Sequence, residues 1–167
     1  MKHLLLVGVL MLVLTSYSQQ NALTVKMGLN RIGLFVAPSY QRVIKKHEFT
    51  AGLKFYTQDQ VFERRYPGLL LGYDFQLFSF KERLFGKVGW SSSIFFENKS
   101  SGNLLLFDHM AHLGIAVAII PKLHFALEPG IGLTNNVVYG ELENPTDYHY
   151  LNYGLAVRLT YYFGSSD

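Results

Sequence analysis

The chain contains no cysteine, which excludes disulfide bonds, thiolate metal sites and a lipid-modified cysteine. It also has few charged residues. Asp, Glu, Lys and Arg make up 16% of the sequence, against about 25% in ordinary soluble domains. Runs of basic residues are lacking too, so the net charge of +3 gives no support for nucleic-acid binding.

Long apolar runs are missing after the first residues. Hydrophobic residues form 49% of the chain. Beyond Leu14, however, no run approaches the roughly 20 residues that a transmembrane helix needs. A high apolar content without a long apolar run means that apolar residues must be interleaved with polar or small ones.

Residues 1–18 have the pattern of a secretory signal peptide. Met1, Lys2 and His3 form a short basic start, Leu4–Leu14 is apolar, and small residues precede a predicted cleavage site after Ser18. We therefore expect a signal peptide over residues 1–18 and one β-barrel domain over residues 19–167. An uncleaved anchor is the alternative.

The interleaving has a period of two, most clearly near the C-terminus. One set of alternate positions is almost entirely large and apolar or aromatic: His149, Leu151, Tyr153, Leu155, Val157, Leu159, Tyr161 and Phe163. The positions between them include Asn152, Gly154 and Arg158. Successive side chains of a strand point to opposite faces, so the pattern predicts a strand with one apolar face.

Eight such segments are found, at 22–29, 32–43, 47–57, 67–80, 84–97, 103–120, 122–136 and 148–163. Many are long enough for a tilted membrane strand, which needs about 9–11 residues. Tight links alternate with longer polar links, as in barrels with short periplasmic turns and longer external loops. The sequence therefore predicts an all-β fold, an eight-stranded antiparallel up-and-down transmembrane β-barrel. The count of eight depends on segment 22–29, which has the weakest pattern.

Alternation alone also fits a soluble lipocalin-like barrel whose apolar face turns inward. Three features favour the membrane orientation: glycines on the polar face, large aliphatic residues on the other face, and aromatic residues near strand ends. The glycines are Gly33, Gly52, Gly72, Gly89, Gly114, Gly130, Gly132 and Gly154. The aromatic residues are Phe78, Phe80, Phe95, Phe96, Tyr148, Tyr161 and Phe163.

The signal-like start, the strand pattern and the final Leu155-x-Val157-x-Leu159-x-Tyr161-x-Phe163 resemble the small OmpA/OmpX-like outer-membrane barrels of Gram-negative bacteria. The resemblance implies an outer-membrane location and contact with membrane lipid and lipopolysaccharide. It also implies recognition of a terminal aromatic by the barrel-assembly machinery. Here four residues, Gly164–Asp167, follow Phe163, which departs from the family pattern. We expect a monomer without a cofactor.

Ten charged or ionisable residues fall on the face expected to point inward. They are Glu48, Lys54, Asp74, Lys87, Glu97, Asp108, His112, His124, Glu128 and Arg158. Buried charges are costly unless they are paired. We therefore expect them to form a network of salt bridges that plugs the interior.

A tight turn at Pro121 could bring His112 opposite Glu128, with His124 further along the same face. A carboxylate that orients a histidine is the core of a general-base arrangement. The PagL-like deacylases, which trim lipopolysaccharide, use a Ser-His-Glu set. The chain has no matching His-x-Ser motif, and Ser91 and Ser93 have no identified base. We therefore expect no enzyme and no metal site, with His112, His124 and Glu128 as the weak catalytic candidates.

Five residues of the predicted external loops are candidates for contact with a partner, a glycan or lipopolysaccharide: Phe62, Arg64, Arg65, Tyr66 and Tyr139. The functional prediction is a small outer-membrane barrel with a plugged polar interior, structural or binding a partner or ligand through these loops. The alternatives are an outer-membrane lipid-modifying acyl hydrolase and a soluble periplasmic lipocalin-like binding barrel.

Overall fold

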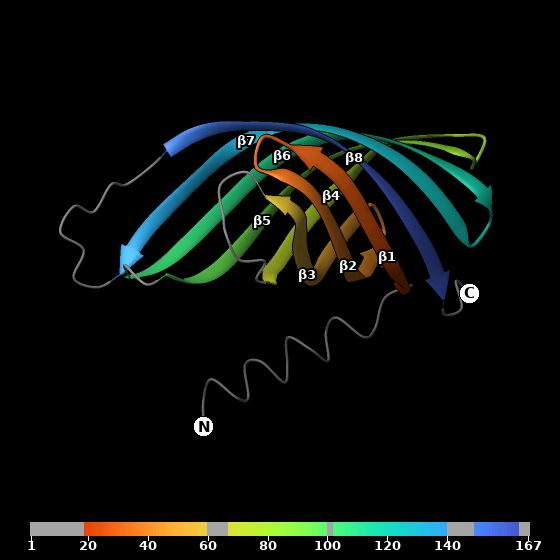
Figure 1. Cartoon of the computed structure of the whole chain (residues 1–167). Coiled ribbons are helices and arrows are strands. Elements are labelled where there is room, and N and C mark those ends of the chain that lie inside the picture. The colour runs from red at the N-terminus through yellow and green to blue at the C-terminus, as the bar shows by residue number, and fades with distance from the viewer. Residues whose placement is uncertain (1–18, 60–66, 100–101, 140–148, 164–167) are drawn as a thin grey trace, which may run out of the picture.

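The computed structural model describes residues 19–59, 67–99, 102–139 and 149–163, and these residues form one closed antiparallel barrel (Figure 1). Its strands are β1 (Gln19–Asn30), β2 (Gly33–Ile44), β3 (His47–Asp59), β4 (Gly68–Phe80), β5 (Leu84–Lys99), β6 (Gly102–Ile120), β7 (Leu123–Tyr139) and β8 (His149–Phe163). Each strand pairs with its neighbours in the chain. The predicted all-β, eight-stranded up-and-down barrel is confirmed.

Strand β1 closes the barrel by pairing with β8. The register runs from Asn21 opposite Phe163 to Asn30 opposite Gly154. Its other edge pairs with β2, from Gln19 opposite Ile44. The weakest predicted segment, 22–29, is therefore a full strand, and closure leaves neither β1 nor β8 with an unpaired edge.

The two ends of the barrel differ. Both terminal strand residues, Gln19 and Phe163, lie at the end that carries the tight β2–β3, β4–β5 and β6–β7 links, which we call the turn end (Figure 1). Lys45, Lys81 and Glu82 adopt positive φ angles of 58°, 50° and 55° in two of these links, as such short connections require. The opposite end, the loop end, carries the β1–β2 link and the connections of β3–β4, β5–β6 and β7–β8.

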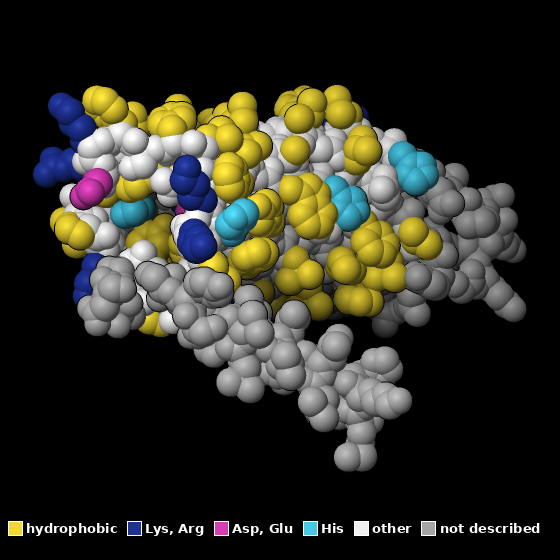
Figure 2. All heavy atoms as spheres, turned by 180° about the vertical axis from the view of Figure 1, so that it is seen from behind, with side chains coloured by type: hydrophobic (Ala, Val, Ile, Leu, Met, Phe, Trp, Pro, Cys, Tyr) yellow, Lys and Arg dark blue, Asp and Glu magenta, His cyan; other side chains and the backbone are white. Residues whose placement is uncertain are grey.

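The outer face of the barrel is covered by large apolar side chains (Figure 2). Leu113 and Ile115 on β6 are 61% and 59% exposed. Leu127 and Ile131 on β7 and Leu155 on β8 are exposed in the same way. The large aliphatic residues therefore face outward, as the sequence predicts, and we call this surface the apolar belt.

Polar side chains border the apolar belt at both ends. At the turn end the Tyr40 hydroxyl donates to Asn21 Oδ1 over 2.5 Å, and at the loop end Arg31 Nη1 donates to the Leu151 carbonyl over 3.2 Å. Asn21 and Arg31 are ten residues apart on the outer face of the first strand and its link. At about 3.4 Å per residue and a tilt of about 40°, they are separated by about 26 Å along the barrel axis. A transmembrane barrel has an apolar band of about this height.

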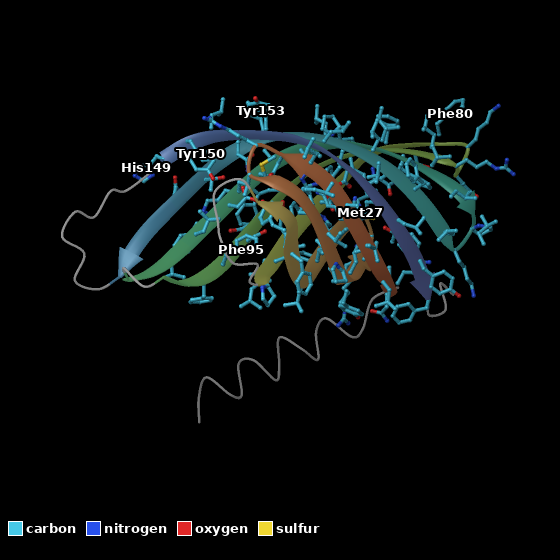
Figure 3. The ribbon with its side chains drawn as sticks, in the orientation of Figure 1. Met27, Phe80, Phe95, His149, Tyr150 and Tyr153 are labelled. Carbon is cyan, nitrogen blue, oxygen red and sulfur yellow. The ribbon has the colours of Figure 1, made fainter. Side chains whose placement is uncertain are left out.

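The predicted aromatic residues do not all face outward. Phe80 and Tyr153 project from the outer surface (Figure 3), but Phe95 is only 6% exposed and points into the barrel. The prediction that Phe95 joins an outer aromatic girdle is therefore wrong. It shares the inward face of β5 with the buried Lys87 and Ser93, because these positions are an even number of residues apart. Tyr148 lies outside the described residues.

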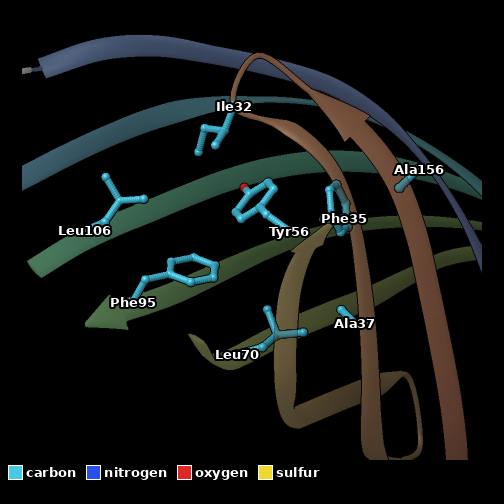
Figure 4. Packing of buried hydrophobic residues seen from close by; sticks show 8 residues of the cluster. All are labelled: Ile32, Phe35, Ala37, Tyr56, Leu70, Phe95, Leu106 and Ala156. Carbon is cyan, nitrogen blue, oxygen red and sulfur yellow. The ribbon is translucent and has the colours of Figure 1, made fainter. Parts of the chain in front are cut away.

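The inside of the loop end is apolar, a feature that the sequence analysis missed. A cluster of buried side chains fills it, which we call the loop-end cluster (Figure 4): Ile32, Phe35, Ala37, Tyr56, Leu70, Phe95, Leu106 and Ala156. Tyr56 packs against Phe35 and Phe95 at ring-centroid distances of 6.0 and 5.3 Å. Ile32, at 0% exposure, belongs to the short β1–β2 link, so this link turns inward and covers the cluster.

The side chain of Asn30 shapes the inward β1–β2 link. Asn30 Oδ1 accepts hydrogen bonds from the backbone N–H groups of Ile32 and Gly33 over 3.0 and 3.1 Å. Its Nδ2 donates to the Tyr56 hydroxyl over 2.9 Å. An asparagine that bonds to backbone two and three residues ahead is a common turn former. Here it also ties the turn to the loop-end cluster.

Candidate functional site in the barrel interior

Five strands contribute the side chains of a charged chain at the middle of the interior. Arg158 of β8 lies between two carboxylates, with Nη1 2.6 Å from Asp74 Oδ2 and Nη2 2.6 Å from Glu128 Oε1. Asp74 also contacts His112 Nε2 at 2.6 Å, and Glu128 contacts Lys26 Nζ at 2.7 Å. We call these five residues the central charge chain.

Two further ion pairs flank the central charge chain. Asp108 accepts from Lys54 Nζ at 2.5 Å and from Asn152 Nδ2 at 2.7 Å, and it receives weaker bonds from Tyr56 and Thr134 at 3.1 Å. Because Tyr56 belongs to the loop-end cluster, this pair joins the charges to the apolar residues. Nearer the turn end, Glu48 is bound by Lys87 Nζ at 2.5 Å and by Gln41 Nε2.

Charge is balanced among the described residues of these ion pairs. Four carboxylates, those of Glu48, Asp74, Asp108 and Glu128, face four fixed cations, those of Lys26, Lys54, Lys87 and Arg158. The inward-facing charged residues predicted from the sequence did not include Lys26, although the alternation of β1 places Lys26 on the same face as Thr24 and Gly28. It also included Glu97, whose side chain lies outside the described residues. Pairing of this kind offsets the cost of burying the charges.

Little space is left among these side chains. A void of about 50 Å³ lies between the loop-end cluster and the central charge chain and is lined by Phe35, Thr50, His112 and Glu128, among others. A site of that size holds a few water molecules at most. A larger cavity of about 460 Å³ opens at the turn end, where Lys81, Arg83, His124 and Tyr162 line it.

Gly89 of β5 makes room for one contact of the central charge chain. A Cβ atom at this position would collide with Asp74 Oδ1 and would lie 2.5 Å from His112 Nε2. Gly114, which also faces inward from the neighbouring strand β6, is less crowded. A Cβ there would be 3.5 Å from the nearest atom, Glu128 Cγ.

We expect Gly89→Ala to destabilise the barrel by about 1–3 kcal/mol, as overpacked interiors do, and Gly114→Ala to have little effect. The measurement is the midpoint of urea unfolding for the barrel refolded in detergent. The folded fraction at each urea concentration is read from heat-modifiable migration on gels. Equal midpoints for the two variants would show that close packing around Asp74 and His112 is unimportant.

The structure does not assemble the predicted catalytic set. The register places Gly130, not Glu128, opposite His112, and the imidazole of His112 instead bonds to Asp74 over Gly89 of the intervening strand β5. Glu128 is occupied by Lys26 and Arg158. His124 lies in the turn-end cavity. Within the described residues, no serine forms a hydrogen bond with His112 or His124.

A serine and a histidine do meet on the outer face, a pair that the sequence analysis missed. Ser92 of β5 is directly opposite His109 of β6, and Ser92 Oγ is 2.9 Å from His109 Nδ1. The imidazole stacks on Trp90 at 6.2 Å. No carboxylate contacts this histidine among the described residues, so the pair lacks the acidic partner of a hydrolytic triad. It satisfies two polar groups on an otherwise apolar surface.

The predicted loop residues Phe62, Arg64, Arg65 and Tyr66 lie outside the described residues. Tyr139 ends β7, where its backbone pairs with Asn103, but its side chain also lies outside them. Within the described part of the chain, no group of three or more His, Asp and Glu side chains could hold a metal ion. The same part of the chain contains no helix that is long and apolar enough to cross a membrane.

Comparisons with known proteins agree with the fold. No protein-family model and no curated protein matches the chain. Among solved structures, the N-terminal β-barrel domain of Pseudomonas aeruginosa OprF is similar, with 14% identity and a TM-score of 0.50 over 86% of this chain and 99% of that domain. Neisserial surface protein A is 11% identical over 84% of this chain and 94% of that one, with a TM-score of 0.46. With its closed eight-stranded barrel, the chain has the fold of the small OmpA/OmpX-like barrels.

Proposed function

We propose that the protein is a small outer-membrane barrel that does not conduct solutes and acts as a membrane-anchored scaffold. The observation that supports this most strongly is the combination of an apolar belt outside and paired charges inside. A soluble lipocalin-like barrel has the opposite arrangement, because its apolar face surrounds the ligand. In a membrane the apolar belt contacts acyl chains, and closure pairs the backbone polar groups.

The filled interior supports the absence of a pore. The loop-end cluster covers one end. Before ions could pass the middle, seven ion pairs or charged hydrogen bonds would have to break. Four hold the central charge chain together, one joins Lys54 to Asp108, and two join Lys87 and Gln41 to Glu48. Moving unpaired charges through such a site costs several kcal/mol. The side chains therefore plug the barrel, which does not act as a channel.

We expect no steady conductance when the purified barrel is inserted in a planar lipid bilayer. Insertion itself is checked by recovery of the heat-modifiable folded band from the same membranes. Stable ohmic channels from every folded preparation would contradict the plugged interior while leaving the membrane location intact.

The same proposal covers the two ends of the chain and the loops. Residues 1–18 direct export and are removed, and Phe163 serves as the terminal aromatic for the barrel-assembly machinery. The protein is a monomer whose external loops contact lipopolysaccharide or a protein partner through Phe62, Arg64, Arg65, Tyr66 and Tyr139. Arginine suits lipid phosphates because its guanidinium forms bidentate hydrogen bonds.

The loop contact can be tested with charge-removing variants. Lipopolysaccharide binding to the barrel should weaken when Arg64 and Arg65 are both changed to Gln. It should be unchanged when Lys46 and Lys122, in turns at the opposite end, are changed to Gln. Loss of binding in the second variant alone would place the contact at the turn end and contradict the proposal.

A further inference from the structure

The cavity at the turn end has the features of a binding site. We propose that it binds a small organic anion, one in which a phosphate or carboxylate group is attached to a flat apolar group. Its volume of about 460 Å³ falls within the range of small-molecule pockets. The proposal goes beyond the scaffold function, because it needs neither the external loops nor a contact with a protein partner.

The rim of the turn-end cavity is basic. Lys81 and Arg83 of the β4–β5 link and Lys45 of the β2–β3 link line it, with Glu82 as the acidic residue among them. Figure 2 shows Lys and Arg side chains gathered at this end of the barrel. Within the described residues, the Arg83 guanidinium has no ion pair or hydrogen bond. A free guanidinium is suited to a phosphate or carboxylate, which it binds through two parallel N–H groups.

The inner wall of the cavity is aromatic. The His124 imidazole stacks on Phe85 at a centroid distance of 5.1 Å and an interplanar angle of 16°. Tyr162 packs against the same imidazole at 4.6 Å. Flat rings prefer offset-stacked or edge contacts with other rings. A ligand with a flat apolar part can therefore extend this stack.

Tyr162 supplies an unused hydrogen-bond donor. Its side chain lines the cavity and the residue is only 4% exposed. In the part of the chain that the structure describes, its hydroxyl has no hydrogen-bond partner. The hydroxyl is therefore available to donate a hydrogen bond to an anionic ligand oxygen in the cavity.

The floor of the cavity does not repel an anion. Its carboxylate, that of Glu48, is already bound by Lys87 Nζ at 2.5 Å and by Gln41. Among all lining residues, the fixed cations Lys45, Lys81, Arg83 and Lys87 outnumber the carboxylates Glu48 and Glu82. The cavity therefore combines a positive charge excess, a stacking surface and a free donor.

The test uses phenyl phosphate as the probe and the whole barrel folded in dodecyl maltoside micelles. Binding is followed by NMR shifts of the barrel amides. We expect saturable shifts in the turns and in Tyr162, weaker binding of inorganic phosphate, and no binding of phenyltrimethylammonium, which has a ring but the opposite charge.

Two variants of the turn end sharpen the test. Changing Lys81 and Arg83 together to Gln should raise the dissociation constant for phenyl phosphate by about tenfold, because two charged contacts are lost. Changing Lys46 and Lys122 together to Gln removes the same charge from the same end, but neither residue lines the cavity, so the change should leave binding unchanged. All four residues are exposed, and both variants should therefore fold.

The anionic group that the basic rim binds could come from a soluble aromatic anion or from the phosphate of an anionic phospholipid headgroup. Titration in nanodiscs separates these sources. If phosphatidylglycerol occupies the cavity, phenyl phosphate binds more weakly in nanodiscs of that lipid than in phosphatidylcholine nanodiscs. Equal affinity in both assigns the site to a soluble anion. The proposal is overturned if phenyl phosphate gives no saturable shifts, if phenyltrimethylammonium binds equally well, or if the two double variants weaken binding to the same extent.

Discussion

Replacement of Arg158 by Leu is expected to destabilise the barrel by about 3–5 kcal/mol. Arg158 is the cation that contacts both Asp74 and Glu128. Without it, each of these buried carboxylates keeps one partner, His112 or Lys26, and the two negative charges lose the group between them. Removing one member of a buried ion pair is strongly destabilising because it leaves charge uncompensated. Urea unfolding of the refolded barrel in detergent measures the loss.

Two comparisons make the Arg158 result specific. Arg83→Leu removes an exposed arginine without a described partner and should change stability by less than about 1 kcal/mol. A triple variant that adds Asp74→Asn and Glu128→Gln to Arg158→Leu should recover part of the loss, because it removes the uncompensated charges. If Arg158→Leu were as stable as Arg83→Leu, the buried charge chain would have no structural role.

The second large effect is expected for Leu127→Arg on the outer face of β7. Leu127 is exposed in the middle of the apolar belt, where an arginine side chain would face lipid. Arginine near the middle of a bilayer costs a barrel about 2–4 kcal/mol, and the cost falls to about 0–1 kcal/mol near the interface. The measurement is the unfolding free energy of the barrel refolded into phospholipid vesicles.

The matched control is Asn135→Arg on the same strand. Asn135 faces outward near the loop end, where its Oδ1 is 2.9 Å from His149 Nδ1. Arginine there should be tolerated, apart from the loss of this exposed hydrogen bond. Equal destabilisation by the two substitutions would mean that the belt does not lie in lipid.

Strand order and facing direction were predictable from the sequence because both depend on local patterns. The period of two in segments such as 149–163 fixes which residues share a face, and tight links such as that at Pro121 fix which strands are neighbours. The predicted boundaries therefore lie within about three residues of the observed strands. Closure by β1 was harder to predict, because its outer residues Leu23, Val25, Met27 and Leu29 form a short apolar series.

The contacts inside the barrel were not predictable in the same way. His112 and Asp74 come from β6 and β4, which are not adjacent strands, so their contact depends on the stagger and tilt of the whole barrel. The sequence analysis instead paired His112 with Glu128, a residue of the next strand. Ile32 was also missed, because its inward position depends on the hydrogen bonds of Asn30 rather than on strand alternation.

Trp90 allows the most direct test of the central claim that the apolar face contacts lipid. It is the single tryptophan of the chain and lies on the outer face of β5 at 47% exposure. The measurement is its fluorescence in vesicles whose acyl chains carry bromine, compared with quenching by iodide in the surrounding water. We predict strong quenching by the brominated chains and little by iodide. Strong quenching by iodide, with none by the brominated lipid, would contradict a membrane barrel with this orientation.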